Sequence, residues 1–306
     1  MATGFFGAPG DAIRLASNDE RVFRLAGKLW ERFRPESPAR GAIDVRVTVR
    51  PGDPAGPVPE KRLVWQHGAD AYTASVEGFL ETRIGLQSGR VESWVTSGLL
   101  DGAPSFAART LLEAPAAVLL SRRGFTVLHA GAVVGPGGAV VVRGASGAGK
   151  STLVAAAWRA GLGILADESL LVSRENADLL AASVRDLTLL PDAERLLGLE
   201  GATEDAFTGG EDKRRVDLFR DSTPGRRVAR RAATLLLGPR SPGPARLVDL
   251  GDEEFVAVFR NGEIPQERSG GDPDAVAAAW AGERSWQLDG ADDLAGAVSI
   301  LEGLAA

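Results

Sequence analysis

The feature of this chain that most constrains its fold is the stretch from Gly144 to Thr152, which reads Gly-Ala-Ser-Gly-Ala-Gly-Lys-Ser-Thr. It fits the pattern G-x-x-x-x-G-K-[ST] at every fixed position. Small residues let successive backbone N–H groups turn inward around a phosphate, and a helix that begins next adds the positive end of its dipole. The stretch therefore predicts a nucleotide-binding loop, and the alternative is a loop that has lost its ligand.

Each residue type in the loop has an expected task. Lys150 neutralises the β- and γ-phosphates as a point charge, and the hydroxyl of Ser151 holds Mg²⁺. The expected ligand is therefore a nucleoside triphosphate with Mg²⁺. The residues expected to contact it are Gly144, Ala145, Ser146, Gly147, Ala148, Gly149, Lys150, Ser151 and Thr152.

The segments around the loop have the order that such a site needs. Residues 139–142 are apolar and rich in valine, which favours a buried strand. Residues 151–160 read as a helix, and Gly161 is suited to end it. Upstream, a strand over 125–134 and a Gly-Pro-Gly-Gly turn predict a β-hairpin that leads into the loop. A strand, a glycine-rich turn and a helix in this order predict an α/β fold.

Composition excludes several other classes of protein. With 306 residues, 44% of them hydrophobic, the chain is long enough for a substantial core. A formal net charge of −6 gives no reason to expect nucleic acid or an acidic membrane surface as a partner. Cysteine is absent, which excludes disulfides and thiolate chemistry. We find no signal peptide and no apolar run long enough to span a membrane, so the expected location is cytoplasmic.

The chain divides into an N-terminal α+β unit, residues 1–103, and a loop-containing domain, residues 104–306. In the first unit the patterns predict one helix and five short strands, at 19–33, 44–50, 62–66, 71–76, 80–86 and 90–95. In the second, a helix over 105–120 should end or kink at its proline, Pro115. Residues 201–225 read as a mobile loop. The patterns also predict two closing helices, at 273–280 and 292–304.

Two acidic residues, Asp167 and Glu168, follow a short apolar segment at 164–166. If this segment is a strand parallel to the one before the loop, Asp167 emerges at the same sheet edge as Lys150. There a carboxylate can orient Mg²⁺ through water or accept the proton of an attacking hydroxyl. The alternative is a surface pair that caps the next segment. An acid this soon after the loop is typical of small-substrate kinases with a compact core.

Histidine and clustered arginine supply further candidates. His129 lies where its side chain can reach the loop and tune a carboxylate, although a lone histidine on a strand is often a core residue. His67 has no such context, and we interpret it as a structural or surface residue. Residues 211–231 are basic and can form a lid, a surface for an acidic substrate or a solvated face. Within them, Lys213 and Arg215 are the expected phosphate contacts.

These segments together resemble a known family. The order Leu-His-Ala-Gly-Ala-Val at 128–133, the loop, and Leu-Ala-Asp-Glu at 165–168 is similar to the HPr serine kinase/phosphorylase family. The resemblance is closer to the HPr-kinase-related kinases, including those found with peptide-modifying gene clusters. The nucleotide-binding core of this group is related to phosphoenolpyruvate carboxykinase. The likeness covers roughly residues 120–175, with a looser match near Lys213.

The resemblance implies roles for individual residues. The loop binds ATP and Mg²⁺, Asp167 takes the proton from a substrate serine hydroxyl, and His129 lies near that carboxylate. Ser151, Asp167 and Glu168 form the implied metal site, although Glu168 stands where the family commonly has a second aspartate. The chain also lacks the family's Glu-Ile-Arg-Gly-type signature, which speaks against phosphorolysis and against HPr as the substrate.

The sequence thus leads to one main functional hypothesis and two alternatives. The main one is an ATP- and Mg²⁺-dependent kinase that phosphorylates a serine hydroxyl of a peptide, a protein or free serine. Its expected architecture is an α/β P-loop kinase core of the HPr kinase/phosphoenolpyruvate carboxykinase type with an N-terminal α+β unit. The alternatives are a small-metabolite kinase of the shikimate or adenylylsulfate type and a nucleotide-gated binding protein without catalysis. An oligomer is possible, since related kinases include hexamers.

Overall fold

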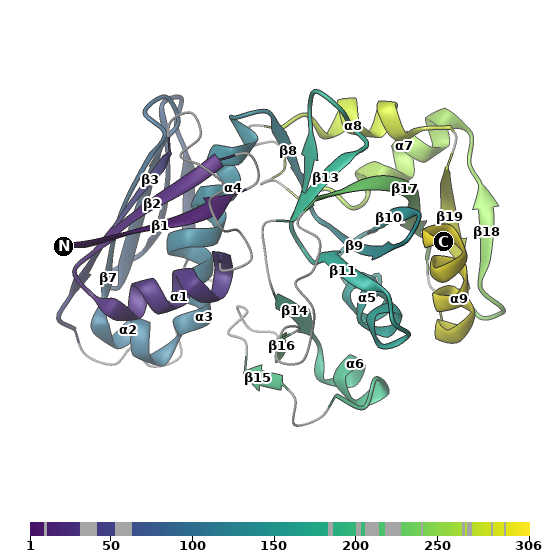
Figure 1. The fold of residues 1–306 in the computed structure, drawn as a ribbon, viewed down its shortest axis with the longest axis horizontal. Coiled ribbons are helices and arrows are strands. Elements are labelled where there is room, and N and C mark those ends of the chain that lie inside the picture. Colours follow the sequence, from purple (N-terminus) through teal and green to yellow (C-terminus); the bar gives the residue numbers. More distant parts are fainter. Residues whose placement is uncertain are drawn as a thin grey trace.

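The protein is a mixed α/β molecule built on two large mixed sheets, as a computed structural model shows. The first sheet lies at the left of Figure 1 and the second at the right. The structure describes residues 1–8, 11–30, 42–52, 63–182, 186–199, 203–205, 214–217, 228–239, 241–264, 267, 271–282, 284–290 and 292–306.

The first sheet has seven strands in the order β1-β2-β3-β7-β6-β5-β4. The β2/β3 and β3/β7 pairs are parallel, and the other pairs are antiparallel. The five predicted strands and the predicted helix are confirmed, but the first two strands were not expected. The elements are β1 Ala2–Ala8, β2 Asp11–Ser17, α1 Glu20–Trp30, β3 Ile43–Arg50, β4 Val64–His67, β5 Ala71–Val76, β6 Leu80–Gly85, β7 Arg90–Thr96 and α2 Ser97–Gly102.

One face of this sheet is buried, and the alternation of residues in β3 shows why. Ile43, Val45, Val47 and Val49 are buried, while the residues between them are partly or fully exposed. This period of two is what the sequence pattern predicted for a half-buried strand. The amphipathic helix α1 buries its own apolar residues in the same core.

A helical segment over residues 104–121 connects the two sheets. It consists of α3 Pro104–Ala108, one π-helical turn η2 Arg109–Glu113, and α4 Ala114–Ser121. Pro115 therefore does not end the helix, and the expected irregularity is the wide turn just before it. Proline has no N–H to donate to the preceding turn, and a turn closed by an i→i+5 bond, Ala114 N–H to the carbonyl of Arg109, precedes it.

The second sheet has nine strands, with the path β11-β9-β10-β17-β13-β12-β8 and with β18 and β19 off it. The predicted hairpin is confirmed in β9 and β10, which pair antiparallel. The single strand expected over 125–134 is in fact two strands, because the chain changes partners at His129. The bounds are β8 Phe125–Leu128, β9 Ala130–Gly135, β10 Gly138–Arg143, β11 Gly163–Ala166, β12 Leu170–Ser173, β13 Leu179–Ala182, β17 Val228–Leu237, β18 Arg246–Asp249 and β19 Ser285–Asp289.

Short elements complete this half of the molecule. A three-stranded sheet, in the order β14-β16-β15, includes two strands within the segment that the sequence predicted to be a mobile loop at 201–225. That prediction is wrong for those two strands. The helices predicted at 273–280 and 292–304 are confirmed as α8 and α9, within two residues at each end. The bounds are β14 Asp186–Leu189, β15 Thr203–Asp205, β16 Arg214–Asp217, α5 Lys150–Arg159, α6 Pro191–Leu196, α7 Asp252–Arg260, α8 Pro273–Trp280 and α9 Leu294–Ala305.

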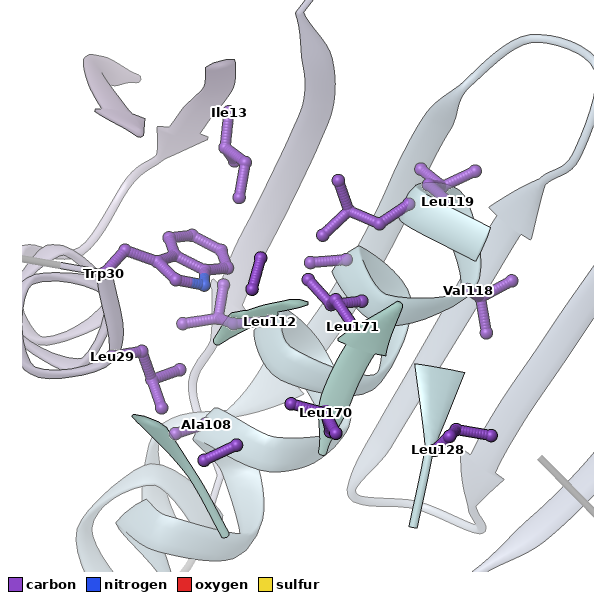
Figure 2. Packing of buried hydrophobic residues seen from close by; sticks show 14 of the residues in the cluster. Ile13, Leu29, Trp30, Ala108, Leu112, Val118, Leu119, Leu128, Leu170 and Leu171 are labelled. Atoms are coloured by element: carbon purple, nitrogen blue, oxygen red, sulfur yellow. The ribbon is translucent and has the colours of Figure 1, made fainter. Parts of the chain in front are cut away.

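One hydrophobic cluster extends from the first sheet to the second. Figure 2 shows Ile13 and Trp30 from the first sheet and α1, Leu112 from the helical segment, and Leu128 and Leu171 from the second sheet. The helical segment thus packs against both sheets, and the division of the chain at residue 103 stays a prediction. Within the described residues, no helix combines the length and apolar character needed to cross a membrane.

Candidate phosphate-binding and transfer site

The glycine-rich loop connects β10 to α5, as its sequence predicted. Gly147 and Gly149 have φ angles of 78° and 98°, a region that L-residues rarely enter. Gly144 is required for a different reason, because a Cβ there would lie 3.0 Å from the Cβ of Leu237 on β17. The loop is thus built from glycine where the backbone turns to the left-handed region and where a neighbouring strand comes close.

Lys150 begins α5 and is almost fully buried, with 7% of its surface exposed. Its Nζ donates hydrogen bonds to the carbonyls of Gly144 and Ala145, at 2.9 and 3.0 Å. The side chain therefore turns back over the loop, which keeps its positive charge at the centre of the motif. A buried ammonium is stable only with such partners.

The sheet topology brings Asp167 to the loop. β11 is antiparallel to β9, and β9 is antiparallel to β10, so β10 and β11 run in the same direction with β9 between them. Their carboxyl ends therefore meet at one edge, as the sequence predicted. There the hydroxyl of Ser151 donates a hydrogen bond of 2.9 Å to Oδ1 of Asp167.

The environment of Asp167 raises the pKa of its carboxyl to about 7. Burial is the largest cause, since only 4% of the residue is exposed, and the negative charge of Glu168 adds to it. The backbone N–H of Thr188, which donates to Oδ2 at 3.2 Å, acts in the opposite direction, as do Ser151 and Lys150. The side chain is thus a buried carboxyl held by hydrogen bonds to both oxygens.

Glu168 has a φ of 64°, which is unusual for a residue with a side chain. Its Oε1 accepts a hydrogen bond of 3.2 Å from the hydroxyl of Thr188, and its Oε2 lies 3.3 Å from Nη2 of Arg109 in the π-helical turn. Strained backbone of this kind is concentrated at functional sites. These contacts hold the second carboxylate beside the first and tie it to the helical segment.

His129 lies at the break between β8 and β9, partly buried beside the loop. Its Nδ1 is buried and has no hydrogen-bond partner within the part of the chain that the structure describes. Burial lowers the pKa of His129 to about 4, helped by the positive charges of Lys150 and Arg143 and opposed by Glu168. A hydrogen bond with the backbone of Gly262 also acts to raise the pKa, but burial outweighs it, so the ring is neutral at neutral pH.

A buried ion pair, Arg143 with Glu267, holds the backbone of His129 in place. Arg143, the last residue of β10, is 0% exposed and makes two hydrogen bonds of 2.8 and 2.9 Å to Glu267. The same carboxylate accepts a hydrogen bond from the backbone N–H of His129. Arg143 also donates to the carbonyl of Phe259 and stacks over its ring at 4.1 Å. The ion pair of Arg143 with Glu267 therefore fixes both the strand end before Gly144 and the backbone of His129.

The prediction that Lys213 and Arg215 contact the phosphates is not tested by the described part of the chain. Lys213 lies outside the described residues. Arg215 belongs to β16, where its backbone pairs with Thr188 on β14 and Glu204 on β15. At the end of the basic stretch, Arg231 binds Asp178 at 2.9 Å and lies over the ring of Trp280, which is a structural role.

Two hollows meet at this site. The first, which we call the loop hollow, has a volume of about 110 Å³ and is lined by the loop, the start of α5, Thr188 to Leu190, and Asp192. The second, which we call the apolar cavity, has a volume of about 190 Å³ and lies between β4 and β5, the helical segment, and the second sheet. His129 and Glu168 line both. These two residues form the wall between the loop hollow and the apolar cavity.

Several residues of this site had no signal in the sequence. Thr188 lies in an ordinary strand, and Glu267 lies in a segment without periodicity. Arg109 was one polar position of a predicted helix. His67, which we interpreted as a structural or surface residue, lies at the mouth of the apolar cavity and stacks on Tyr72 with ring centroids 4.5 Å apart. Only the alternation of aromatic residues over 65–67 hinted at an exposed aromatic strand.

Comparison with known proteins assigns no role to the residues of this site. The chain matches no protein-family model and no curated protein.

Proposed function

We propose that this protein is an ATP- and Mg²⁺-dependent kinase that transfers the γ-phosphate to a hydroxyl group, the serine hydroxyl of a peptide, a protein or free serine. The observation that carries the proposal is the hydrogen bond between Ser151 and the buried carboxyl of Asp167. It joins the hydroxyl that the loop motif assigns to Mg²⁺ to the carboxyl that the resemblance assigns as the base. The two mixed α/β sheets around it are compatible with such a kinase, and the HPr-kinase-like P-loop core is part of the proposal.

The residues present suit both expected ligands. The turned backbone at Gly147 and Gly149, with Lys150 above it, suits the phosphates of ATP. Mg²⁺ in phosphate sites takes one or two carboxylates together with phosphate oxygens and water, and Ser151, Asp167 and Glu168 supply such oxygens. When bound, the ion neutralises charge on the phosphates.

The chain's own groups account for the steps of the transfer. The acceptor oxygen forms a bond to the γ-phosphorus while the bond from that phosphorus to the bridging oxygen of ADP breaks. Asp167 accepts the hydroxyl proton, which its raised pKa favours at neutral pH. Lys150 and the loop amides stabilise the charge that develops on the phosphate oxygens. His129, neutral at neutral pH, lines the wall where the acceptor meets the loop hollow and contributes to its shape without adding a charge.

The test is phosphate transfer measured by intact-mass spectrometry, with Mg²⁺ and ATP and with free L-serine, an HPr protein and a serine-bearing peptide as acceptors. We expect one acceptor to gain a single phosphate mass and Asp167→Asn to reduce the rate by at least about a hundredfold, the scale of general-base losses. Asp249→Asn, on the exposed face of β18, is the matched control and should retain the full rate.

The result also separates the alternatives. A variant Asp167→Asn that binds ATP and transfers phosphate at the original rate would refute the assignment of the base. ATP binding by the original chain with no transfer to any acceptor would instead favour the nucleotide-gated binding protein.

A further inference from the structure

The apolar cavity has a composition unlike that of the loop hollow beside it. Trp65 from β4 and Tyr72 from β5 line one side, and Phe106 and Val118 line the helical side. Val127 and Ile264 come from the second half of the chain. Aromatic and aliphatic groups make up most of the exposed wall. The charged side chains that also line it are Arg109, Glu113, Glu168 and Glu267; Arg109 pairs with Glu168, and Glu267 pairs with Arg143.

The cavity has a size that selects a class of ligand. An apolar cavity of about 150 Å³ holds a benzene molecule, and this one measures about 190 Å³. It therefore accommodates a single six-membered ring or a branched alkyl group with a short polar arm. Aromatic walls favour such a group, since stacked and edge-to-face ring contacts add to simple burial. Trp65, His67 and Tyr72 already make contacts of this kind with one another.

The polar end of the cavity is the wall that it shares with the loop hollow. His129 and Glu168 line both hollows there. Asp167 precedes Glu168 in the chain and accepts the hydrogen bond of Ser151, which lines the loop hollow. A ligand that buries its apolar body among the aromatic residues therefore presents a polar arm toward the groups that receive the γ-phosphate. A ligand with a full charge on its body does not suit the aromatic part of the wall at Trp65, Tyr72 and Phe106, because the desolvation of that charge is unfavourable.

We propose that the apolar cavity binds the body of the phosphate acceptor, and that this acceptor is an alcohol with a compact apolar group about the size of a benzene ring. The inference rests on the proposed kinase function and narrows its acceptor. Free serine is a poor fit, because it has no apolar group to fill the aromatic part of the cavity. The ring can belong to a small alcohol or to a side chain next to a serine in a peptide, and the chemistry at the cavity is the same.

Binding is tested first, without phosphate transfer. The chain carries six tryptophans, so the protein is labelled with 5-fluorotryptophan and the ¹⁹F resonance of Trp65 is assigned with Trp65→Phe. We expect 2-phenylethanol and N-acetyl-seryl-phenylalaninamide to shift the Trp65 resonance saturably and to leave Trp158, on α5, unmoved. Free L-serine at the same concentration should shift neither. No saturable shift of Trp65 with either ring-bearing alcohol overturns the inference.

Filling the cavity provides the second arm. Ala117 on α4 lines the cavity, so Ala117→Leu should weaken 2-phenylethanol binding by at least tenfold and leave ATP binding unchanged. Ala279→Leu places the same side chain on the exposed face of α8 and should change neither. If Ala117→Leu does not fold, the smaller change Ala114→Val, one turn earlier on the same wall, replaces it. Unchanged alcohol binding in a folded cavity variant contradicts the inference.

Transfer then distinguishes this inference from the proposed function. If a ring-bearing alcohol is phosphorylated and Ala117→Leu reduces the rate, the result supports both the kinase function and the acceptor assignment. If the dipeptide then reacts faster than 2-phenylethanol, the natural acceptor is a peptide. Transfer to free serine that Ala117→Leu leaves unchanged keeps the kinase and overturns the acceptor assignment. Saturable binding in the cavity with no transfer to any acceptor overturns the kinase and with it the acceptor role, while the ligand class of the cavity stands.

Discussion

The two sides of the candidate site are built in opposite ways. The loop side is local: residues 144–168 include the glycine-rich loop, the helix that follows it and the acid at the end of β11. The cavity side is assembled from β4, β5, the helical segment and residues near 264, which are as far apart as 200 positions in the chain. A sequence motif can specify the loop side, because its geometry depends on the backbone and on residue spacing. The cavity side exists only through tertiary packing.

This comparison predicts that the long-range contacts have the larger effect on stability. Glu267→Gln leaves the guanidinium of Arg143 buried without its counter-charge, and breaking one partner of a buried pair costs about 3–5 kcal/mol. We expect a loss of that size in the free energy of unfolding, measured by urea denaturation. The exposed pair Arg260–Asp274 is the control, and Asp274→Asn should change stability by less than about 1 kcal/mol. Equal effects of the two substitutions would contradict the prediction.

On the loop side, Lys150→Ala should affect function and leave the fold intact. We expect phosphate transfer to fall by at least about a hundredfold, the scale of losing one group that stabilises charge in the transition state. Weaker ATP binding should accompany it, as measured by calorimetry. Lys28→Ala, on the exposed face of α1, is the matched lysine change and should have no effect. Full transfer activity in Lys150→Ala would mean that the loop does not hold the reacting phosphates.

The difference between the two sides also explains how much the sequence could predict. The hairpin, the loop, α5 and the meeting of Ser151 with Asp167 were predictable, because they depend on neighbouring residues and on the direction of adjacent strands. The positive φ of Glu168, the ion pair of Arg143 with Glu267 and the aromatic wall at Trp65 were not. Arg143 and Glu267 are 124 positions apart, and the cavity wall joins residues from Leu63 to Glu267, so no local pattern records these contacts.

Thr188 joins the two sides, so its substitution gives a smaller and more specific effect. Thr188→Val keeps the backbone N–H that holds Asp167 and removes only the hydroxyl that holds Glu168. One hydrogen bond contributes about 1–1.5 kcal/mol, so transfer should fall roughly five- to tenfold. Thermal unfolding should change little, since valine has nearly the same shape. A loss as large as that of Asp167→Asn would mean that Glu168 has a direct role in the chemistry.

The smallest expected effects come from two glycines, one in each half of the molecule. Gly149→Ala places a side chain at a φ of 98° in the loop, which should cost about 1–2 kcal/mol and weaken ATP binding. Gly27→Ala lies within α1, where an added Cβ meets nothing within 4 Å, and should raise stability by about 0.5–1 kcal/mol. Urea denaturation and ATP titration of both variants measure the contrast. A gain of stability in both variants would show that the loop does not require its left-handed backbone at Gly149.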